Sequence, residues 1–112
     1  MEARFRKFQE SLQPAVKLQI AAEDYFKEGL SQSCREVYRN YLKSRLRPGA
    51  QLLILEEDTD RLEGLWAIEA FSGPLTEDLL QFSIENQKPA AYTWLLRKKQ
   101  ETWGFHPRDY RL

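Results

Sequence analysis

Apolar residues recur every three or four positions along almost the whole chain, and this spacing predicts helices rather than strands. Phe5, Phe8 and Leu12 form the first series. A second series begins after Pro14, a residue that fits the first turn of a helix but not its interior. The N-terminal region is therefore expected to contain a short helix followed by a second one, as part of an all-α fold.

Serine, glycine and proline residues divide the first half of the chain into three expected helices. Gly29 is expected to end the second helix, and Ser31 or Ser33 to cap the third. Glu36 follows Ser33 by three residues and completes a capping-box pattern. The Arg-Pro-Gly sequence at 47–49 is expected to form the turn that ends the third helix.

Residues 50–57, AQLLILEE, form the one segment for which the pattern allows either a buried helix or a buried strand. Leucine, alanine, glutamine and glutamate favour a helix, and Ile54 is the only β-branched residue in the segment. We therefore expect a helix here.

Three further helices follow, each marked by a residue type that is common at a helix start. Asp58 or Asp60 is expected to cap the first of them. Thr76 is expected to open the second, which has acidic residues in its first turn and Ile84 on its buried side. Pro89 is expected to begin the third.

Residues 78–98, DLLQFSIENQKPAAYTWLLRK, resemble the ankyrin repeat, whose consensus runs approximately TPLHLAAENGHLEVVRLLLEK. The ungapped alignment places Glu85 and Asn86 at the end of the first helix of a repeat, and Gln87 in the turn that follows. The sequence departs from the pattern where Gln81 replaces a histidine and Gln87 replaces the turn glycine. The resemblance implies a divergent, ankyrin-like helix pair.

A more degenerate copy of this pattern lies roughly thirty residues upstream, in residues 50–70, at a spacing typical of helical repeats. Two copies are fewer than a free-standing solenoid normally needs, so the N-terminal helices are expected to act as a cap. The run LLRKKQETWGF at 95–105 is also similar to the C-terminal ends of small helical proteins of Firmicutes bacteria, which read approximately LLxYKNxxFG. This resemblance implies a bacterial protein and carries no defined activity with it.

The periodicity and the resemblances together predict a compact, all-α, multi-helix domain of antiparallel helix pairs with an ankyrin-like pair at its C-terminal end. A chain of 112 residues fits a single domain. The expected parts of this domain, 1–112, are N-terminal helices at 1–48, ankyrin-like helix pairs at 49–105 and a tail at 106–112.

Composition excludes several classes of protein. Hydrophobic residues make up 42% of the chain and charged residues 30%, which is typical of an ordered globular protein. One cysteine and one histidine exclude an internal disulfide and a Cys/His metal cluster. The N-terminal residues are interrupted by charges, unlike a secretory signal, and no apolar run is long enough to span a membrane. We therefore expect a cytoplasmic location and no membrane association.

The charges cancel but are unevenly distributed along the chain. The net charge is +4 over residues 1–48, −8 over 49–87 and +4 over 88–112. We interpret these blocks as mutually complementary or solvated faces, with a charge-guided partner surface as the alternative. A net charge of zero argues against a dedicated nucleic-acid binder, for which a basic domain is expected.

Three groups of residues have side chains suited to chemistry, and for each a structural role is the preferred interpretation. His106 and Asp109 have the residue types of an acid–base pair, but no nucleophile accompanies them. Cys34 lies near an expected helix start, which favours a reactive thiolate, yet a lone helical cysteine is more often packed in a core. The acidic residues between 56 and 63 lack the glycine and the fixed alternation of a calcium loop. We predict no catalytic residue, no metal ligand and no cofactor.

The sequence is therefore most consistent with a non-catalytic protein-interaction or accessory module, whose partner is another protein. The alternative is a small nucleic-acid-associated regulatory protein that uses its basic and aromatic terminal segments to stack bases and follow phosphates. The sequence leaves the oligomeric state open. Residues expected to contact the partner are Tyr92, Lys98, Lys99, Trp103 and Arg108.

Overall fold

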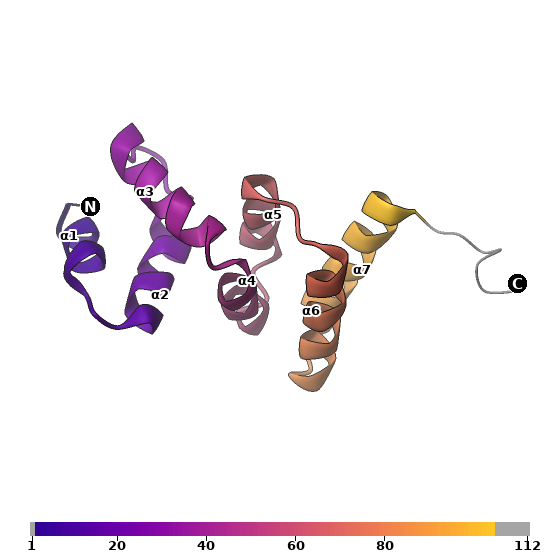
Figure 1. Ribbon diagram of the computed structural model, residues 1–112. Helices are drawn as coiled ribbons and strands as arrows, with labels where there is room; N and C mark the ends of the chain where they lie inside the picture. The colour runs from indigo at the N-terminus through magenta and orange to yellow at the C-terminus, as the bar shows by residue number, and fades with distance from the viewer. Residues whose placement is uncertain (1, 105–112) are drawn as a thin grey trace, which may run out of the picture.

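The computed structural model describes residues 2–104, and over this range the chain is all-helical, with no strand (Figure 1). The prediction of an all-α fold is confirmed. None of the helices in this range has both the length and the apolar content needed to cross a bilayer. The helices are α1 (Glu2–Glu10), α2 (Pro14–Asp24), α3 (Gln32–Lys43), α4 (Leu46–Leu55), α5 (Thr59–Ile68), α6 (Gly73–Glu85) and α7 (Pro89–Trp103).

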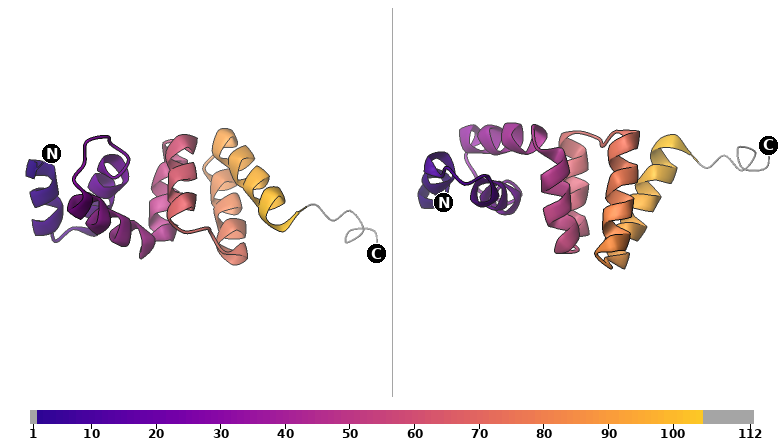
Figure 2. Two further views of the ribbon diagram at one scale, coloured as in Figure 1. Left: turned by 90° about the horizontal axis from the view of Figure 1, so that it is seen from above. Right: turned by 60° about the horizontal axis from the view of Figure 1, so that its bottom comes forward.

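The helices succeed one another in a row, so that helices close in sequence are also close in space (Figures 1 and 2). Helix α2 packs against α1 and α3 at the N-terminal end of the row. Helices α4 and α5 form a first hairpin, and α6 and α7 form a second hairpin that packs on the first through α4–α6 and α5–α7 contacts. The second hairpin is therefore the last unit of the row over the described residues.

Several expected helix boundaries are wrong in position. The sequence at 47–49 does not end a helix but lies within the first turns of α4, because a proline is tolerated where a backbone N–H has no helical acceptor. The division expected between 48 and 49 therefore falls inside a helix. Helix α2 ends at Asp24, and Gly29 lies in the following loop with a φ of +81°.

Capping side chains explain where other helices begin. Ser31 rather than Ser33 caps α3, since its side chain accepts a hydrogen bond from the backbone N–H of Cys34. Helix α6 begins at Gly73 with Ser72 as its cap, so Thr76 lies within this helix instead of opening it. The expectations for Asp58 as the cap of α5 and for Pro89 at the start of α7 are confirmed.

One contiguous apolar core runs through the row of helices. Near the N-terminal end, the rings of Phe5 and Phe8 meet Tyr38 edge-on, with centroid distances of 5.5 and 5.0 Å. Phe71, which follows the first hairpin, forms a cluster with Trp66 and Trp94, with ring centroids 4.9 and 6.3 Å from theirs, and the two tryptophan rings meet edge-on at 6.1 Å. Aromatic side chains thus join units at both ends of the row.

Gly64 lies where the loop after α2 packs against the first hairpin. A Cβ atom at this position would lie 2.3 Å from Cε1 of Phe26, a distance that real side chains do not tolerate. The absence of a side chain at Gly64 therefore allows the ring of Phe26 to lie directly against α5.

The turns of the two hairpins have the same backbone conformation thirty residues apart. The central residues, Glu57 and Gln87, both adopt a left-handed conformation, with φ of +52° and +58°. The backbone hydrogen bonds of the turns also correspond. In the first hairpin, the N–H groups of Glu57 and Asp58 donate to the carbonyls of Ile54 (2.9 Å) and Leu53 (3.0 Å). In the second, the N–H groups of Gln87 and Lys88 donate to the carbonyls of Ile84 (3.1 Å) and Ser83 (2.9 Å). Each residue of the first hairpin turn therefore has a positional counterpart in the second.

Candidate functional site

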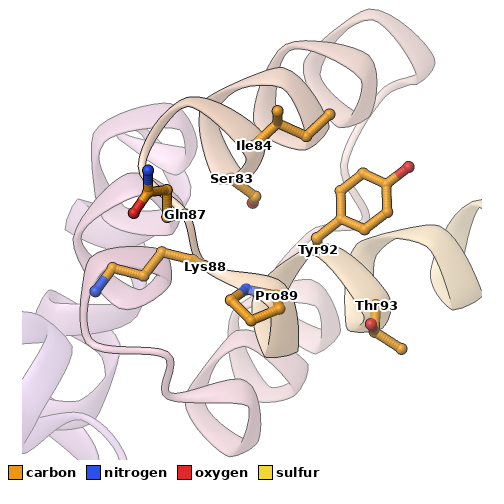
Figure 3. A pocket seen from close by; sticks show the side chains of 7 residues that line it. All are labelled: Ser83, Ile84, Gln87, Lys88, Pro89, Tyr92 and Thr93. Carbon is orange, nitrogen blue, oxygen red and sulfur yellow. The ribbon is translucent and has the colours of Figure 1, made fainter.

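An open groove of about 470 Å³ lies where α6 ends and α7 begins (Figure 3). Ile84 from α6 and Tyr92 from α7 lie near each other and both line this groove, as does Pro89 at the start of α7. We refer to the surface around the groove as the terminal face. Its lining residues are Ser83, Ile84, Gln87, Lys88, Pro89, Tyr92 and Thr93.

Local structure fixes the shape of the terminal face. The left-handed Gln87 reverses the chain, and Pro89 starts α7 two residues later. The hydroxyl of Ser83 donates to the carbonyl of Leu79 at 2.9 Å, so this buried side chain is satisfied within its own helix. The part of the groove next to Ser83 therefore requires no polar group from a ligand.

The first hairpin has an equivalent face, which we call the covered face because the second hairpin packs on it. Residues thirty positions apart show how the terminal face differs from it. Ile54 and Ile84 occupy equivalent positions, but Ile54 is fully buried whereas Ile84 is 55% exposed. Likewise Leu62 is fully buried, whereas its counterpart Tyr92 is only partly buried. The second hairpin packs on the first, and no helix of residues 2–104 packs on the second in the same way. The expectation that Ile84 is buried is therefore wrong.

The polar residues of the covered face bind the next hairpin. A carboxylate oxygen of Glu57 accepts a hydrogen bond from the backbone N–H of Ala90, at 3.2 Å and at the start of α7. Glu63 accepts from the indole N–H of Trp94 at 3.1 Å and forms an ion pair with Lys98. The hydrogen bond from Lys98 is the main reason why the pKa of Glu63 is lowered.

The counterparts of these two glutamates on the terminal face are neutral. Gln87 takes the position of Glu57, and Thr93 takes the position of Glu63. The terminal face thus keeps apolar side chains at the equivalent positions but loses both carboxylates. It can make apolar contacts, whereas it lacks the charges that orient α7 on the first hairpin.

The five expected contact residues lie in different surroundings. Tyr92 lines the groove, and Trp103 lies at the end of α7 with 40% of its surface exposed. The ammonium of Lys98 is paired with Glu63 and lies over the rings of two tryptophans, leaving only 13% of its side chain exposed. Lys99 forms an ion pair with Glu77 on α6. Arg108 lies outside the described residues.

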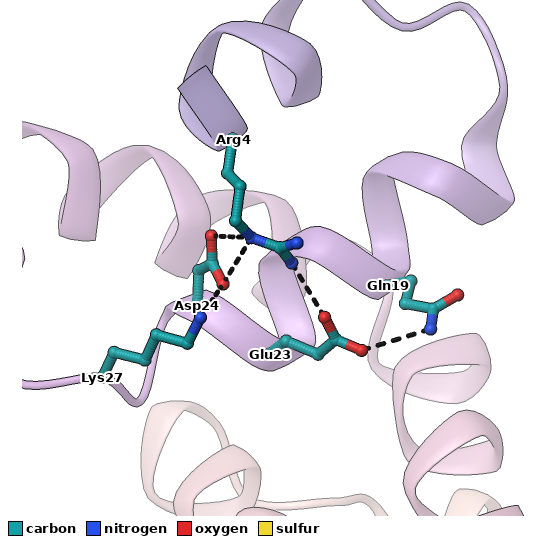
Figure 4. Close-up of polar contacts among 5 residues, drawn as sticks. All are labelled: Arg4, Gln19, Glu23, Asp24 and Lys27. Atoms are coloured by element: carbon teal, nitrogen blue, oxygen red, sulfur yellow. Dashed lines mark hydrogen bonds and ion pairs between the residues drawn. The ribbon is translucent and has the colours of Figure 1, made fainter. Parts of the chain in front are cut away.

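A second cluster of polar side chains joins α1 to α2 (Figure 4). The Nε atom of Arg4 donates to both carboxylate oxygens of Asp24, at 3.0 and 2.7 Å, and Lys27 pairs with the same carboxylate at 2.9 Å. Arg4 also donates to Glu23, which in turn accepts from Gln19. The arrangement leaves the fully buried Asp24 without an uncompensated charge.

The electrostatics of this cluster indicate a structural role. Burial raises the pKa of Asp24, but hydrogen bonds from Arg4 and Lys27 outweigh this effect and leave the pKa below its usual value. Nearby, burial raises the pKa of Tyr38 to about 12, and its hydroxyl has no hydrogen-bond partner among the described residues. The phenol therefore stays neutral at physiological pH.

The remaining chemical candidates in the described part of the chain lie apart from the residues that line the groove. Cys34 is partly buried in the first turn of α3. Asp58 caps α5 and pairs with Arg61, so this acidic residue has a structural role, as Glu57 and Glu63 do. No three His, Cys, Asp or Glu side chains between residues 2 and 104 are grouped to hold a metal ion. His106 and Asp109 lie outside the described residues.

Sequence reasoning missed Ile84 and Pro89 as site residues, because helical spacing assigned Ile84 to the core. The signal that could have indicated them is their position in the second copy of the repeated pattern, because each unit of a helical repeat leaves an apolar face for its neighbour to cover. Comparison of the chain with protein-family models, with curated proteins and with solved structures finds no match. The functional assignment therefore depends on the geometry of the terminal face.

Proposed function

We propose that this chain is a non-catalytic protein-interaction or accessory module, and that a protein partner docks on the terminal face. The observation that carries this proposal is the difference between Ile54 and Ile84, which hold the same side chain at equivalent positions but are 0% and 55% exposed. In the first hairpin the equivalent surface is an interface with the next unit of the row. A partner on the terminal face would bury Ile84 as the second hairpin buries Ile54.

The matched hairpins support the view that the chain is a short, divergent, ankyrin-like repeat protein. Their turns share hydrogen bonds and left-handed residues at a displacement of thirty positions. Proteins built from stacked helix pairs bind partners through the surfaces that the stack leaves open. A cytoplasmic location is part of the same proposal, because the free, partly buried Cys34 suits a reducing compartment.

The carboxyl groups with shifted pKa values have structural partners, and this favours a binding role over a catalytic one. Among the described residues, Asp24 and Glu63 are the carboxyl groups whose pKa values are lowered, and both are bound to basic side chains that hold helices together. Neither lines the groove of the terminal face. Their electrostatics are therefore accounted for by the fold, without a reaction to explain.

A nucleic-acid-binding role is the weaker alternative. It depends on the basic block at 88–112, in which Lys98 and Lys99 are paired with Glu63 and Glu77. These carboxylates neutralise positive charge that phosphates would require. Retention of single-stranded RNA or DNA in a mobility-shift assay at moderate salt, with loss of binding as the salt rises, would favour this alternative.

Affinity capture from the native cell tests the proposal. The tagged chain is compared with an Ile84→Asp variant and with a Leu55→Asp control, because Leu55 is 44% exposed but does not line the groove. We expect the wild type and the control to enrich the same protein at least about ten-fold more than the Ile84 variant does, as for loss of a central interface residue. Equal enrichment by all three forms would contradict the proposal, as would turnover of a substrate in a broad hydrolase and transferase screen.

A further inference from the structure

Helix α1 is attached to the row at one end and by few side chains. It packs mainly on α2, and it reaches α3 through the rings of Phe5 and Phe8 (Figure 1). Residues 11–13 join α1 to α2, and the middle one, Leu12, is 96% exposed, so the linker adds little apolar packing. A helix of nine residues is not stable alone in water, so these contacts keep α1 helical.

One ion-pair cluster contributes to the attachment of α1. Arg4 on α1 binds Glu23 and Asp24 at the end of α2 (Figure 4). The side chain of Arg4 is 42% exposed, whereas that of Asp24 is fully buried. Lys27, in the loop after α2, pairs with the same carboxylate at 2.9 Å. Because Lys27 does not belong to α1, Asp24 keeps one cation if α1 moves away.

The hydroxyl of Tyr38 is a second donor near Asp24 that the observed arrangement does not use. Tyr38 has no exposed surface, and its hydroxyl is the one buried side-chain polar atom of residues 2–104 without a hydrogen-bond partner. Such a group is unfavourable and rare in folded proteins. After burial, the charge of Asp24 is the next cause that raises the pKa of Tyr38 to about 12, so the two groups lie close together.

Helix α1 supplies both constraints that keep Tyr38 and Asp24 from bonding. The rings of Phe5 and Phe8 pack edge-on against Tyr38, with centroid distances of 5.5 and 5.0 Å, and fix the position of the phenol. The Nε atom of Arg4 donates to both oxygens of Asp24. Departure of α1 would therefore free the phenol to move and an acceptor to receive it.

Departure of α1 would also uncover a defined surface and leave a core behind. Phe8 meets the ring of Tyr41 edge-on at 5.1 Å, and Phe5 lines a depression together with Cys34 at the start of α3. Both Tyr41 and Cys34 would become more exposed. Among the described residues, Phe8 is the buried apolar side chain that α1 contributes to the core, and the others come from the chain after α1.

We infer that α1 is a detachable lid over the aromatic side of α3, and that the hydroxyl of Tyr38 replaces Arg4 as a donor to Asp24 when the lid opens. The closed form carries an unpaired buried hydroxyl, whereas the open form exposes Phe8. These two costs oppose each other, which narrows the free-energy difference between the forms. The lid lies at the opposite end of the row from the terminal face, so it operates independently of a partner there.

Phe8→Asp in the full chain tests whether α1 detaches, because a charge in place of the buried ring disfavours the closed form. Circular dichroism should show loss of no more helix than the nine residues of α1. Cys34 is the only cysteine of the chain, and its thiol should react faster with a thiol reagent than in the wild type. Loss of helix far beyond α1, or unchanged reactivity of Cys34, overturns the lid.

Tyr38→Phe tests the exchange of donors, because its effect should differ between the closed and the open form. In the wild-type background it removes an unpaired hydroxyl, so urea unfolding should give an unchanged or higher folding equilibrium constant. In the Phe8→Asp background it removes a hydrogen bond to a charged group, so this constant should fall at least about ten-fold.

Tyr25→Phe is the matched control, because the ring of Tyr25 packs edge-on against Phe26, and its effect should be equal in both backgrounds. Equal effects of Tyr38→Phe in the two backgrounds overturn the exchange of donors.

Hydrogen exchange measures the opening without a disruptive substitution. The amide of Ser11 donates to the carbonyl of Lys7 at 2.9 Å, so it reports on the last turn of α1. Tyr38→Phe removes a cost of the closed form and a bond of the open form, so exchange of the α1 amides through opening should slow at least about ten-fold. Unchanged exchange of these amides in Tyr38→Phe overturns the inference.

Discussion

Ile54 and Ile84 allow the same substitution to be made at equivalent positions with and without a covering hairpin. Each is the penultimate residue of its helix, and each carbonyl accepts the corresponding turn hydrogen bond. Replacement by alanine therefore changes intrinsic helix propensity by a similar amount at both sites. The difference between the two variants isolates the free energy of the packing provided by the second hairpin.

The structure sets the expected sizes of the two effects. Ile54 has no exposed surface, so Ile54→Ala is expected to lower the free energy of unfolding by about 3 kcal/mol, within the usual 2–5 kcal/mol range for buried aliphatic truncations. Ile84 retains less than half of that burial, so Ile84→Ala is expected to cost at most about 1 kcal/mol. The difference of about 2 kcal/mol corresponds to a factor of about 30 in the folding equilibrium constant.

Urea unfolding followed by circular dichroism measures both values. The protein concentration is kept near 1 µM, so that contacts between copies of the chain do not contribute to the stability of either variant. A milder Ile54→Val variant, with an expected cost of about 1 kcal/mol, provides a measurable step if the alanine variant is too unstable to fold. Equal losses at both positions would refute the conclusion that the second hairpin covers one site and leaves the other open.

Four other substitutions test three separate features of the fold. Asp24→Asn should lower the free energy of unfolding by about 2 kcal/mol at pH 7, because it removes charged hydrogen bonds. The lowered pKa of Asp24 means that this carboxylate stabilises the fold above about pH 4 and that its contribution is lost as the pH falls further. Acidification should therefore reduce the free energy of unfolding less in the variant than in the wild type. Gln87→Gly should raise the melting temperature by relieving a left-handed conformation, worth about 0.5–1 kcal/mol, whereas Glu57→Gly should gain less because it also removes a hydrogen bond to α7. Gly64→Ala should cost about 1–3 kcal/mol in chemical denaturation, because the ring of Phe26 must move, and a neutral result would contradict the close approach described for it.

Local chemistry allowed much of the fold to be predicted from the sequence. Asp58 and Pro89 were correctly assigned to helix starts. A capping carboxylate accepts a hydrogen bond from a backbone N–H only a few residues away, and proline fixes its own φ at a value that suits the first turn of a helix. Within the segment 50–57, residues 50–55 were correctly assigned to a helix, because leucine-rich segments with one β-branched residue favour that conformation, whereas Glu56 and Glu57 lie in the turn that follows. These features depend on neighbours along the chain, which the sequence displays directly.

The predicted helix boundaries were wrong where one residue type can either end a helix or begin one. Proline ends a helix when it would fall in the interior, but it begins one when it falls in the first turn. The sequence at 47–49 was therefore interpreted as a stop, although α4 had already begun at Leu46. Thr76 was interpreted as a start for a similar reason, because the cap at Ser72 is followed at once by Gly73 and Pro74.

The candidate site was the least predictable feature, because it depends on contacts between distant residues. Helical spacing identifies Ile84 as part of an apolar stripe, but it does not determine whether another helix covers that stripe. Lys98 was expected to contact a partner, which stays a prediction, and its pairing with Glu63, thirty-five residues away in the sequence, was not expected. Only the arrangement of the hairpins relative to each other distinguishes these cases.

The linear arrangement of helices also has a consequence for partial unfolding. The first hairpin packs against α2 and α3 on one side and against the second hairpin on the other, whereas the second hairpin packs mainly on the first. Amide protons in α6 and α7 should therefore exchange with solvent through local opening at a lower free energy than those in α4 and α5. A ligand bound to the last helix pair would protect these amides most. Its binding would bring the opening free energy of α6 and α7 closer to that of α4 and α5, so that the two hairpins would unfold more cooperatively.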